Sequence, residues 1–145
     1  MTTSTLNPRL QEIADEFRAV PESDRLQLLL EFAEELPPLP ARFAGHRELL
    51  EPVPECQTPL FLAVELDDDR TVQLFFDAPR ESPTTRGFAG ILHAGLDGLT
   101  AQEVLDTPAE FSGQLGLQDL VSPLRLRGMV AMLARIKRRV REHPG

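Results

Sequence analysis

Apolar residues recur at helical spacing in two segments near the start of the chain. Residues 7–20 open with Asn7, a good helix cap, and with Pro8, which suits the first helical position, so they predict a helix. Residues 21–36 repeat the spacing and predict a second helix. The inward stripes comprise Leu10, Ile13, Phe17 and Val20 in the first segment and Leu26, Leu29, Leu30, Phe32 and Ala33 in the second.

The pattern changes in the middle of the chain. Residues 37–55 are too rich in proline for regular structure, so we expect a long surface loop there. Residues 60–78 contain two apolar runs and predict a strand hairpin. Asp67, Asp68 and Asp69 separate these runs. We expect them to form the turn rather than a calcium loop, because no further carboxylate or glycine has the required spacing.

Helices are predicted again from residue 84 onward. Residues 84–96 predict a helix packed by Phe88, Ile91 and Leu92. Two short helices follow, each introduced by a capping box, Thr100 with Glu103 and Thr107 with Glu110. Ser122 caps a long final helix that starts at Pro123. The inner side of this helix comprises Leu126, Val130, Leu133, Ile136 or Lys137, and Val140.

This order of elements separates a short run of strands from runs of helices. It is typical of an α+β fold in which helices cover one face of a small antiparallel sheet. No parallel crossover is needed. A chain of 145 residues fits one domain, which we expect to span residues 1–145.

Composition narrows the function classes. The chain is 41% hydrophobic and 26% charged, as in ordinary soluble proteins, and it carries no signal-like or membrane-spanning run. We therefore expect a cytoplasmic protein, or one in an equivalent reducing compartment, with no membrane partner. The net charge of −8 argues against nucleic-acid binding. Residues 123–141 nevertheless carry seven of the fifteen basic groups. We interpret them as a solvated helix face, with RNA or an anionic membrane as the alternative.

Cys56 is the only cysteine, and it lies in the proline-bounded stretch VPECQTP. One cysteine cannot form an intramolecular disulfide or hold a metal site alone, and the three histidines lie far apart in the sequence, so no resident metal or cofactor is expected. A loop restrained by prolines presents a side chain at a defined position. The alternative is a small hydrophobic residue buried under the loop.

Thiol chemistry requires a thiolate, and the charge of Glu55 raises the pKa of the neighbouring thiol. Positive charge must then come from elsewhere. The best source is the start of the final helix, where the Ser122 cap leaves backbone N–H groups pointing outward and Arg125 and Arg127 follow. Acidic residues are usual in a first turn, so two arginines suggest an anion site or an acidic partner. The alternative is that both extend into solvent.

With these elements in place, the chain resembles the SufE family of sulfur-acceptor proteins, which serve cysteine desulfurases in iron–sulfur cluster assembly. The resemblance runs from about residue 9 to residue 141. It includes the cysteine turn, for which the family pattern is Val-x-Gly-Cys-Gln-Ser. It also includes a final helix that begins Ser-Pro-x-Arg-x-x-Gly. The matching stretches are LLLEFAEELPPLP, VPECQTPLF, VQLFFDA, RGFAGIL and LTAQEVLDTPAEFSGQLGLQDLVSPLRLRGMVAMLARIK. Family members have a fold like that of IscU-type scaffolds.

The resemblance implies a sulfur carrier and desulfurase activator rather than a stand-alone enzyme. Cys56 would take a persulfide sulfur from a SufS-like cysteine desulfurase and pass it to a SufBCD-like scaffold complex. Pyridoxal phosphate would belong to the desulfurase, so this chain would need no cofactor. The other implied site residues are Asp77, bordering the cysteine, Arg125, facing it from the helix start, and Glu55, Gln57 and Thr58, shaping the loop.

The chain departs from the family pattern in places: Glu55 replaces a glycine, Phe61 a common tryptophan, and Arg127 an Asn or Gln. Two alternatives therefore stay open, a single-thiol redox enzyme or sensor and a SufE-like protein that feeds sulfur to another thiolation pathway. We also expect a sheltered resting thiol that docking exposes, because an open persulfide would lose its sulfur to small thiols. The expected shelter consists of Leu49, Leu50, Val53 and Leu60.

Overall fold

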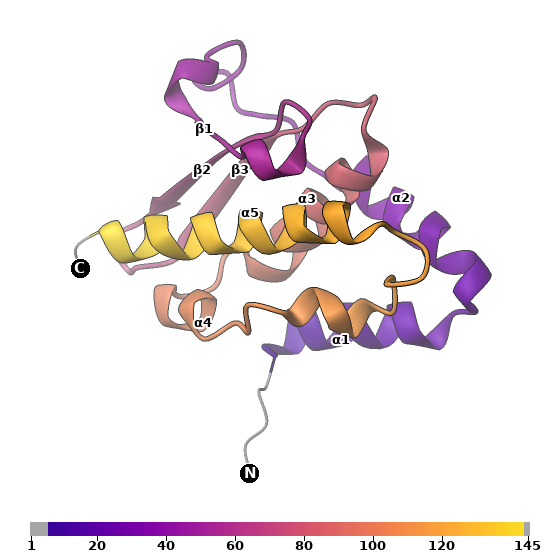
Figure 1. Cartoon of the computed structure of the whole chain (residues 1–145). Coiled ribbons are helices and arrows are strands. Elements are labelled where there is room, and N and C mark those ends of the chain that lie inside the picture. Colours follow the sequence, from indigo (N-terminus) through magenta and orange to yellow (C-terminus); the bar gives the residue numbers. More distant parts are fainter. Residues whose placement is uncertain (1–5, 144–145) are drawn as a thin grey trace.

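The computed structural model describes residues 6–143 and opens with two helices (Figure 1). Helix α1, Pro8–Ala19, begins as predicted, because the Asn7 side chain accepts a hydrogen bond of 3.0 Å from the backbone N–H of Leu10. Helix α2, Arg25–Glu35, follows a short 3₁₀ turn. Its predicted inward stripe is wrong at Leu26, which is 40% exposed. Leu26 lies N-terminal to the residues where helix α3 packs against α2.

Three antiparallel strands form the sheet, in the order β1-β2-β3. Strands β2, Phe61–Leu66, and β3, Val72–Asp77, make the predicted hairpin, with Leu62 opposite Phe76. The Asp67 side chain closes its turn by accepting hydrogen bonds from the backbone N–H groups of Asp69, at 3.0 Å, and Thr71, at 2.9 Å. The expected aspartate turn is confirmed.

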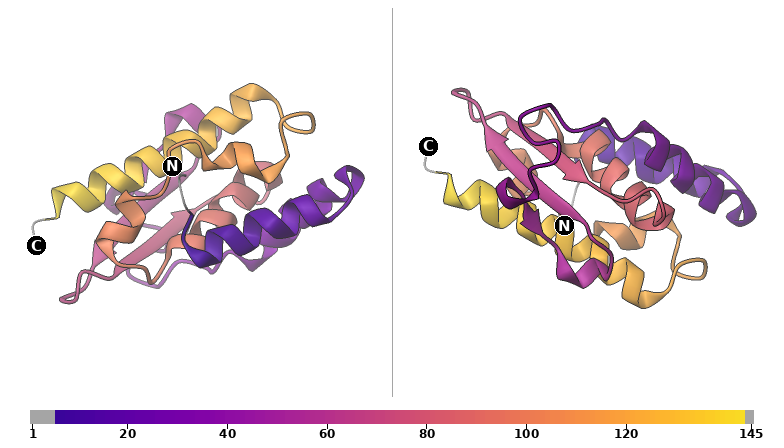
Figure 2. Two further views of the ribbon diagram at one scale, coloured as in Figure 1. Left: turned by 90° about the horizontal axis from the view of Figure 1, so that it is seen from below. Right: turned by 90° about the horizontal axis from the view of Figure 1, so that it is seen from above.

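The remaining helices lie on one face of the sheet (Figures 1 and 2). They are α3, Pro83–Leu96, α4, Ala101–Leu105, and α5, Pro123–Glu142. Ser122 caps α5 as predicted, accepting a hydrogen bond of 3.2 Å from the N–H of Arg125. The α+β fold with a one-sided helical layer is thereby confirmed.

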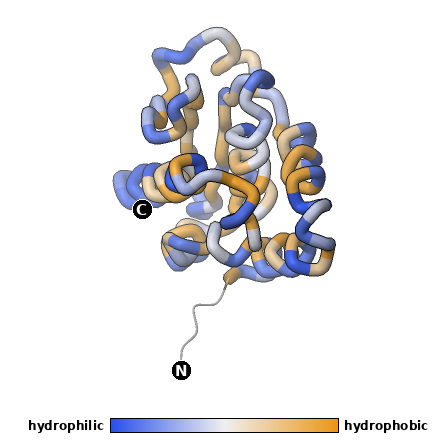
Figure 3. Tube along the Cα trace, turned by 45° about the vertical axis from the view of Figure 1, so that its right-hand side comes forward, coloured by the Kyte–Doolittle hydropathy of each residue, from blue (hydrophilic) through white to orange (hydrophobic). Residues whose placement is uncertain are grey.

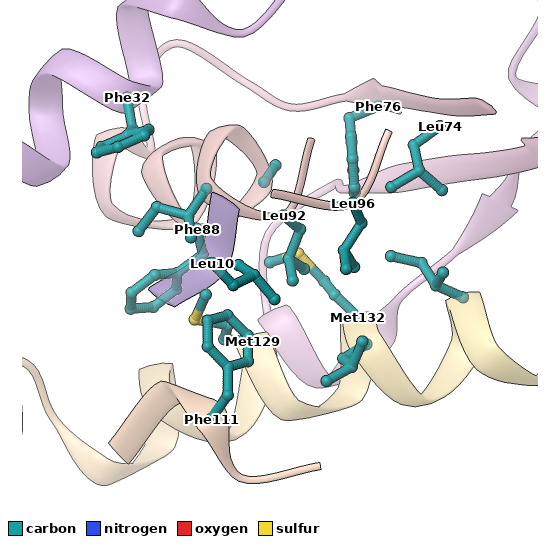
Figure 4. Close-up of a cluster of buried hydrophobic side chains, with 14 of the residues drawn as sticks. Leu10, Phe32, Leu74, Phe76, Phe88, Leu92, Leu96, Phe111, Met129 and Met132 are labelled. Atoms are coloured by element: carbon teal, nitrogen blue, oxygen red, sulfur yellow. The ribbon is translucent and has the colours of Figure 1, made fainter. Parts of the chain in front are cut away.

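The core lies between this helical layer and the sheet. Side chains from α3 and α5 meet there with Phe111 of the 3₁₀ helix η4, Phe111–Leu115 (Figure 4). Along α5, apolar and polar stretches alternate, and the last turns are strongly hydrophilic (Figure 3). Met129 and Met132 are fully buried, whereas the predicted Leu126 and Val130 are only partly buried. The inner face of α5 is therefore rotated relative to the predicted stripe, while Leu133, Ile136 and Val140 are buried as expected.

The segment between α2 and the sheet crosses the other face of the sheet (Figure 2, right). Phe43 packs on Phe75 of β3 with ring centroids 5.1 Å apart, and the guanidinium of Arg42 lies over both rings. The predicted long loop over residues 37–55 is confirmed for most of its length and is wrong only where short 3₁₀ turns and one short strand interrupt it. The segment contains strand β1, Glu51–Pro52, because a proline is tolerated in an edge strand, where its missing N–H faces away from the sheet.

The second predicted capping box is also wrong. Thr107 is buried, and its hydroxyl donates to the carbonyl of Glu103 at 3.1 Å, so it closes the end of α4 instead of opening a new helix. The 3₁₀ helix η4 follows Glu110 without a side-chain cap. The first box forms as expected, with Thr100 and Glu103 each satisfying the other's backbone N–H.

Candidate functional site

The only cysteine lies in a one-turn 3₁₀ helix, η3, Pro54–Cys56, between β1 and β2. The turn is closed by a backbone hydrogen bond of 2.9 Å from the N–H of Val53 to the carbonyl of Leu60. Gln57 ends η3 in the left-handed conformation, with φ of 58°, and its N–H returns to the carbonyl of Pro54. Pro54, Pro59 and the hydrogen bond from Gln57 to Pro54 therefore restrain the backbone that carries Cys56.

Cys56 packs against helix α5 at Gly128 (Figure 1, where η3 is the magenta turn beside α5). Its Sγ–H donates to the Gly128 carbonyl at 3.7 Å. A Cβ at position 128 would lie 3.2 Å from Sγ and 3.3 Å from Cα of Cys56, closer than such contacts normally are. The glycine that ends the Ser-Pro-x-Arg-x-x-Gly stretch therefore allows the close approach of the cysteine turn.

The resting thiol is partly shielded, as expected. Cys56 is half-buried and packs on the hydrophobic core. Of the four residues predicted to supply the shelter, Val53 and Leu60 are buried in the core on which Cys56 packs, and Leu50 is buried as well. The fourth, Leu49, is 56% exposed, because it ends a short 3₁₀ turn at the surface.

The surroundings of Cys56 disfavour its thiolate. The pKa of the thiol is raised to about 11, mainly by burial; the charge of Glu55 acts in the same direction, and the charge of Arg135 acts in the opposite one. At neutral pH about one molecule in ten thousand then carries the thiolate. In this position the cysteine is a poor nucleophile.

Two acidic residues that precede Cys56, Glu51 in β1 and Glu55 in η3, bind arginines of α5. Arg135 donates from Nη1 to Glu51 at 2.7 Å and from Nη2 to both oxygens of Glu55 at 2.8 and 3.0 Å. Glu51 also accepts from Arg138 and, at 2.8 Å, from Arg139. Three of the seven basic groups interpreted as a solvated face therefore pair with the cysteine loop. The interpretation is wrong for these three, since β1 brings Glu51 beside α5.

These contacts shift the pKa values of the two acids. Burial acts to raise the pKa of Glu51, but the hydrogen bonds from Arg135 and Arg139 and the charge of Arg138 outweigh it, so its pKa lies below the ordinary value. The hydrogen bond from Arg135 is the main reason why the pKa of Glu55 is also lowered. Both acids are therefore ionised at neutral pH.

The other predicted site residues include Arg125 on α5, Asp77 on β3 and Thr58 directly after η3. Arg125 is exposed in the first turn of α5, and its role toward Cys56 stays a prediction. Asp77, at the end of β3, accepts a hydrogen bond of 2.9 Å from Nε of Arg47. Thr58 lies in the turn after η3, and its hydroxyl is buried with no hydrogen-bond partner among residues 6–143.

Sequence reasoning gave no role to Glu51, Gly128 or Arg135. Glu51 was part of a loop with no expected structure, and Arg135 was one of several basic residues on a helix. The only signal in the sequence was that the segment before Cys56 carries acids and the terminal helix carries basic residues. This signal does not say which residues meet.

Neither a metal site nor a membrane span is found in the described part of the chain. Within residues 6–143, no three His, Cys, Asp or Glu side chains come together in a way that could hold a metal ion. Over the same residues, no helix combines the length and the apolar character that crossing a bilayer requires.

The fold and the site define a small α+β protein that presents one sheltered thiol on a restrained turn. The SufE model, described as an Fe-S metabolism associated domain, matches residues 11–140. An uncharacterized SufE-like protein of Mycobacterium tuberculosis is 56% identical over 139 residues, covering 96% of both chains. The chain therefore belongs to the SufE family. Proteins of this family generally work with cysteine desulfurases, which supports a role in sulfur transfer in general.

Two further comparisons agree with this assignment. SufE-like protein 1, chloroplastic/mitochondrial, of Arabidopsis thaliana is 32% identical over 129 residues, which cover 88% of this chain and 33% of that protein. The solution structure of a hypothetical protein from Thermus thermophilus superposes with a TM-score of 0.83 at 39% identity, covering 95% of this chain and 97% of that one.

Proposed function

We propose that Cys56 accepts a sulfur atom from the active-site persulfide of a cysteine desulfurase and passes it to an iron–sulfur cluster assembly scaffold. The observation that carries this proposal is the single thiol, held on a restrained turn in a chain of the SufE family. The pyridoxal phosphate of the reaction belongs to the desulfurase. Arg125, Asp77, Gln57 and Thr58 are the proposed supporting residues.

The transfer needs no outside oxidant or reductant. The Cys56 thiolate attacks the outer sulfur of the partner's Cys–S–SH group, and a new S–S bond forms at Cys56. The S–S bond of the partner breaks, and its cysteine leaves as a thiolate with the electron pair. Cys56 then carries Cys–S–SH, and the proton released from its thiol balances the thiolate of the partner. The second transfer repeats this exchange with the scaffold as acceptor.

The resting geometry favours this function over the redox alternative. Redox-sensor cysteines are accessible and have a low pKa. Cys56 is half-buried, and its pKa is raised to about 11. Such a thiol is protected from small oxidants and electrophiles until its turn leaves α5, which suits a carrier that reacts only inside a partner's active site.

Cys56→Ser tests the proposal directly. Wild-type protein incubated with a cysteine desulfurase and L-cysteine should gain one sulfur atom on Cys56, and the variant should gain none, because serine cannot form a persulfide. The substitution is small and leaves the fold intact, so the urea unfolding midpoint should be unchanged. Intact-mass and peptide mass spectrometry provide the measurement.

The outcomes separate the alternatives. A serine variant that stimulates the desulfurase as well as the wild type does would contradict the proposal. A single-thiol redox sensor would instead gain oxygen rapidly from dilute peroxide and no sulfur from the desulfurase. A protein that serves another thiolation pathway would gain sulfur on Cys56 but would fail to deliver it to an iron–sulfur scaffold.

A further inference from the structure

Two residues of α5 that lie seven positions apart hold the cysteine turn. Gly128 and Arg135 occupy the same face of the helix, because seven residues make about two full turns. Cys56 packs on Gly128, and the neighbouring Glu55 binds Arg135. Two adjacent residues of the short helix η3 therefore contact α5, Cys56 by close packing at Gly128 and Glu55 by an ion pair with Arg135.

Arg135 is well placed to restrain this turn. Its guanidinium binds Glu51 with one terminal nitrogen and Glu55 with the other, and its side chain is only 24% exposed. Glu51 belongs to β1 and is 11% exposed, so it anchors the arginine on the side of the sheet. Glu55 is 49% exposed and is the outer partner. The anchored arginine thus offers Glu55 a fixed position at which to bind.

We propose that the Glu55–Arg135 ion pair is a latch that keeps Cys56 docked on α5, and that Glu55 and Arg135 are positioning residues for the acceptor thiol. This inference rests on the proposed sulfur transfer for its biological meaning. Glu55 stands where the family pattern has a glycine, which cannot form such a pair. An exposed ion pair contributes little free energy, so a docking partner can open the latch without a large cost.

Alkylation of the free protein by iodoacetamide, which is uncharged, measures the latch. The protection ratio is the alkylation rate of a urea-unfolded chain divided by the rate of the same chain when folded, at the same pH. The effect of the neighbouring Glu55 charge on the thiol largely cancels, because both rates come from one variant. Loss of the Arg135 charge raises the pKa of the docked thiol and so acts against the expected fall in the ratio. Glu55→Gln and Arg135→Gln should each lower this ratio about two- to fivefold, as expected for the loss of a surface ion pair.

Matched variants separate the latch from a general change of charge. Glu142→Gln removes an acid that pairs with Arg138 and Arg139 within α5 and does not touch the turn. Arg141→Gln removes an exposed cation of the same helix. Both should keep the wild-type protection ratio. In the Arg135→Gln background, Glu55→Gln should add nothing, because the latch is already absent. Arg135→Lys, which keeps the charge, should restore part of the protection.

Salt provides a test without any mutation. The wild-type protection ratio should fall between low salt and 1 M NaCl, where screening acts within about 3 Å, and Glu55→Gln should lose most of this dependence. Glu55→Gln and Arg135→Gln ratios equal to those of Glu142→Gln and Arg141→Gln would overturn the latch, as would a salt-independent wild-type ratio. All of these measurements use the protein without a desulfurase, so their failure is distinct from a failure of the sulfur-transfer proposal.

Discussion

Gly128 is the residue at which the cysteine turn meets helix α5, and its missing side chain has a direct effect on the thiol. Elsewhere in a helix, glycine costs about 1 kcal/mol relative to alanine, so its presence in α5 needs a compensating reason. The reason is the space that Cys56 occupies, since Sγ and Cα would both lie within 3.3 Å of an added Cβ. The residue that weakens the helix thus makes the sheltered position possible.

Gly128→Ala should therefore open the turn. The added methyl group crowds only the docked state, at a cost of about 1–3 kcal/mol, whereas the gain in helix propensity applies to docked and open states alike. The protection ratio of Cys56 toward iodoacetamide should fall about fivefold or more, while the helical circular dichroism stays at the wild-type level. An unchanged ratio would show that the neighbouring atoms absorb the methyl group.

At the scale of elements, strand β1 and helix α5 are joined by a charge cluster rather than by apolar packing alone. Glu51 of β1 accepts hydrogen bonds from three arginines of α5, and Glu55 shares one of them. The cluster neutralises part of the basic helix and ties the cysteine loop to it. Contacts within the chain therefore account for three of the seven basic residues of the terminal helix, Arg135, Arg138 and Arg139.

The lowered pKa values of Glu51 and Glu55 give this cluster a defined pH dependence. A carboxyl whose pKa is lower when folded binds protons more tightly when unfolded. Its stabilising contribution is complete above the unfolded pKa of about 4.3 and is lost as the pH falls through the folded value. Wild-type stability should therefore fall below about pH 4.5, and Glu51→Gln should make that fall shallower.

Urea unfolding at several pH values between 3 and 7 provides the measurement. At neutral pH, Glu51→Gln should lower the free energy of unfolding by about 1–3 kcal/mol, as expected when hydrogen bonds to a charged group are lost. Glu12→Gln, which changes an exposed acid on α1, serves as the control. An identical pH slope for wild type and Glu51→Gln would show that the cluster does not contribute to stability.

At the scale of the whole molecule, helix α3 is the central element on which α1, α2 and α5 pack. Its glycines face α2 and α1 directly: a Cβ at Gly90 would collide with the backbone carbonyl of Phe32, and one at Gly95 would meet the side chain of Leu10. The helices can approach this closely only because no side chain intervenes. Helix α3 in turn packs against α5, and α5 packs against the cysteine turn η3.

Gly90→Ala should therefore destabilise the whole protein, by about 1–3 kcal/mol in urea unfolding, because the clashing atoms belong to backbone and cannot move aside. Gly113→Ala is the matched control. That glycine is exposed, and an added Cβ would come no closer than 3.5 Å to a flexible glutamine side chain. Equal unfolding midpoints for the two variants would contradict a tight backbone contact between α2 and α3.

The sequence by itself determined the helices, the hairpin and the α+β class, because their signals are local. The Asn7 and Ser122 caps and the aspartate turn act within four residues along the chain. Only the tertiary structure decided which charges surround the thiol, since the ion pairs of Glu51 and Glu55 join residues 80 to 88 positions apart. Such pairs depend on how α5 crosses the sheet, and no periodicity or cap specifies that crossing.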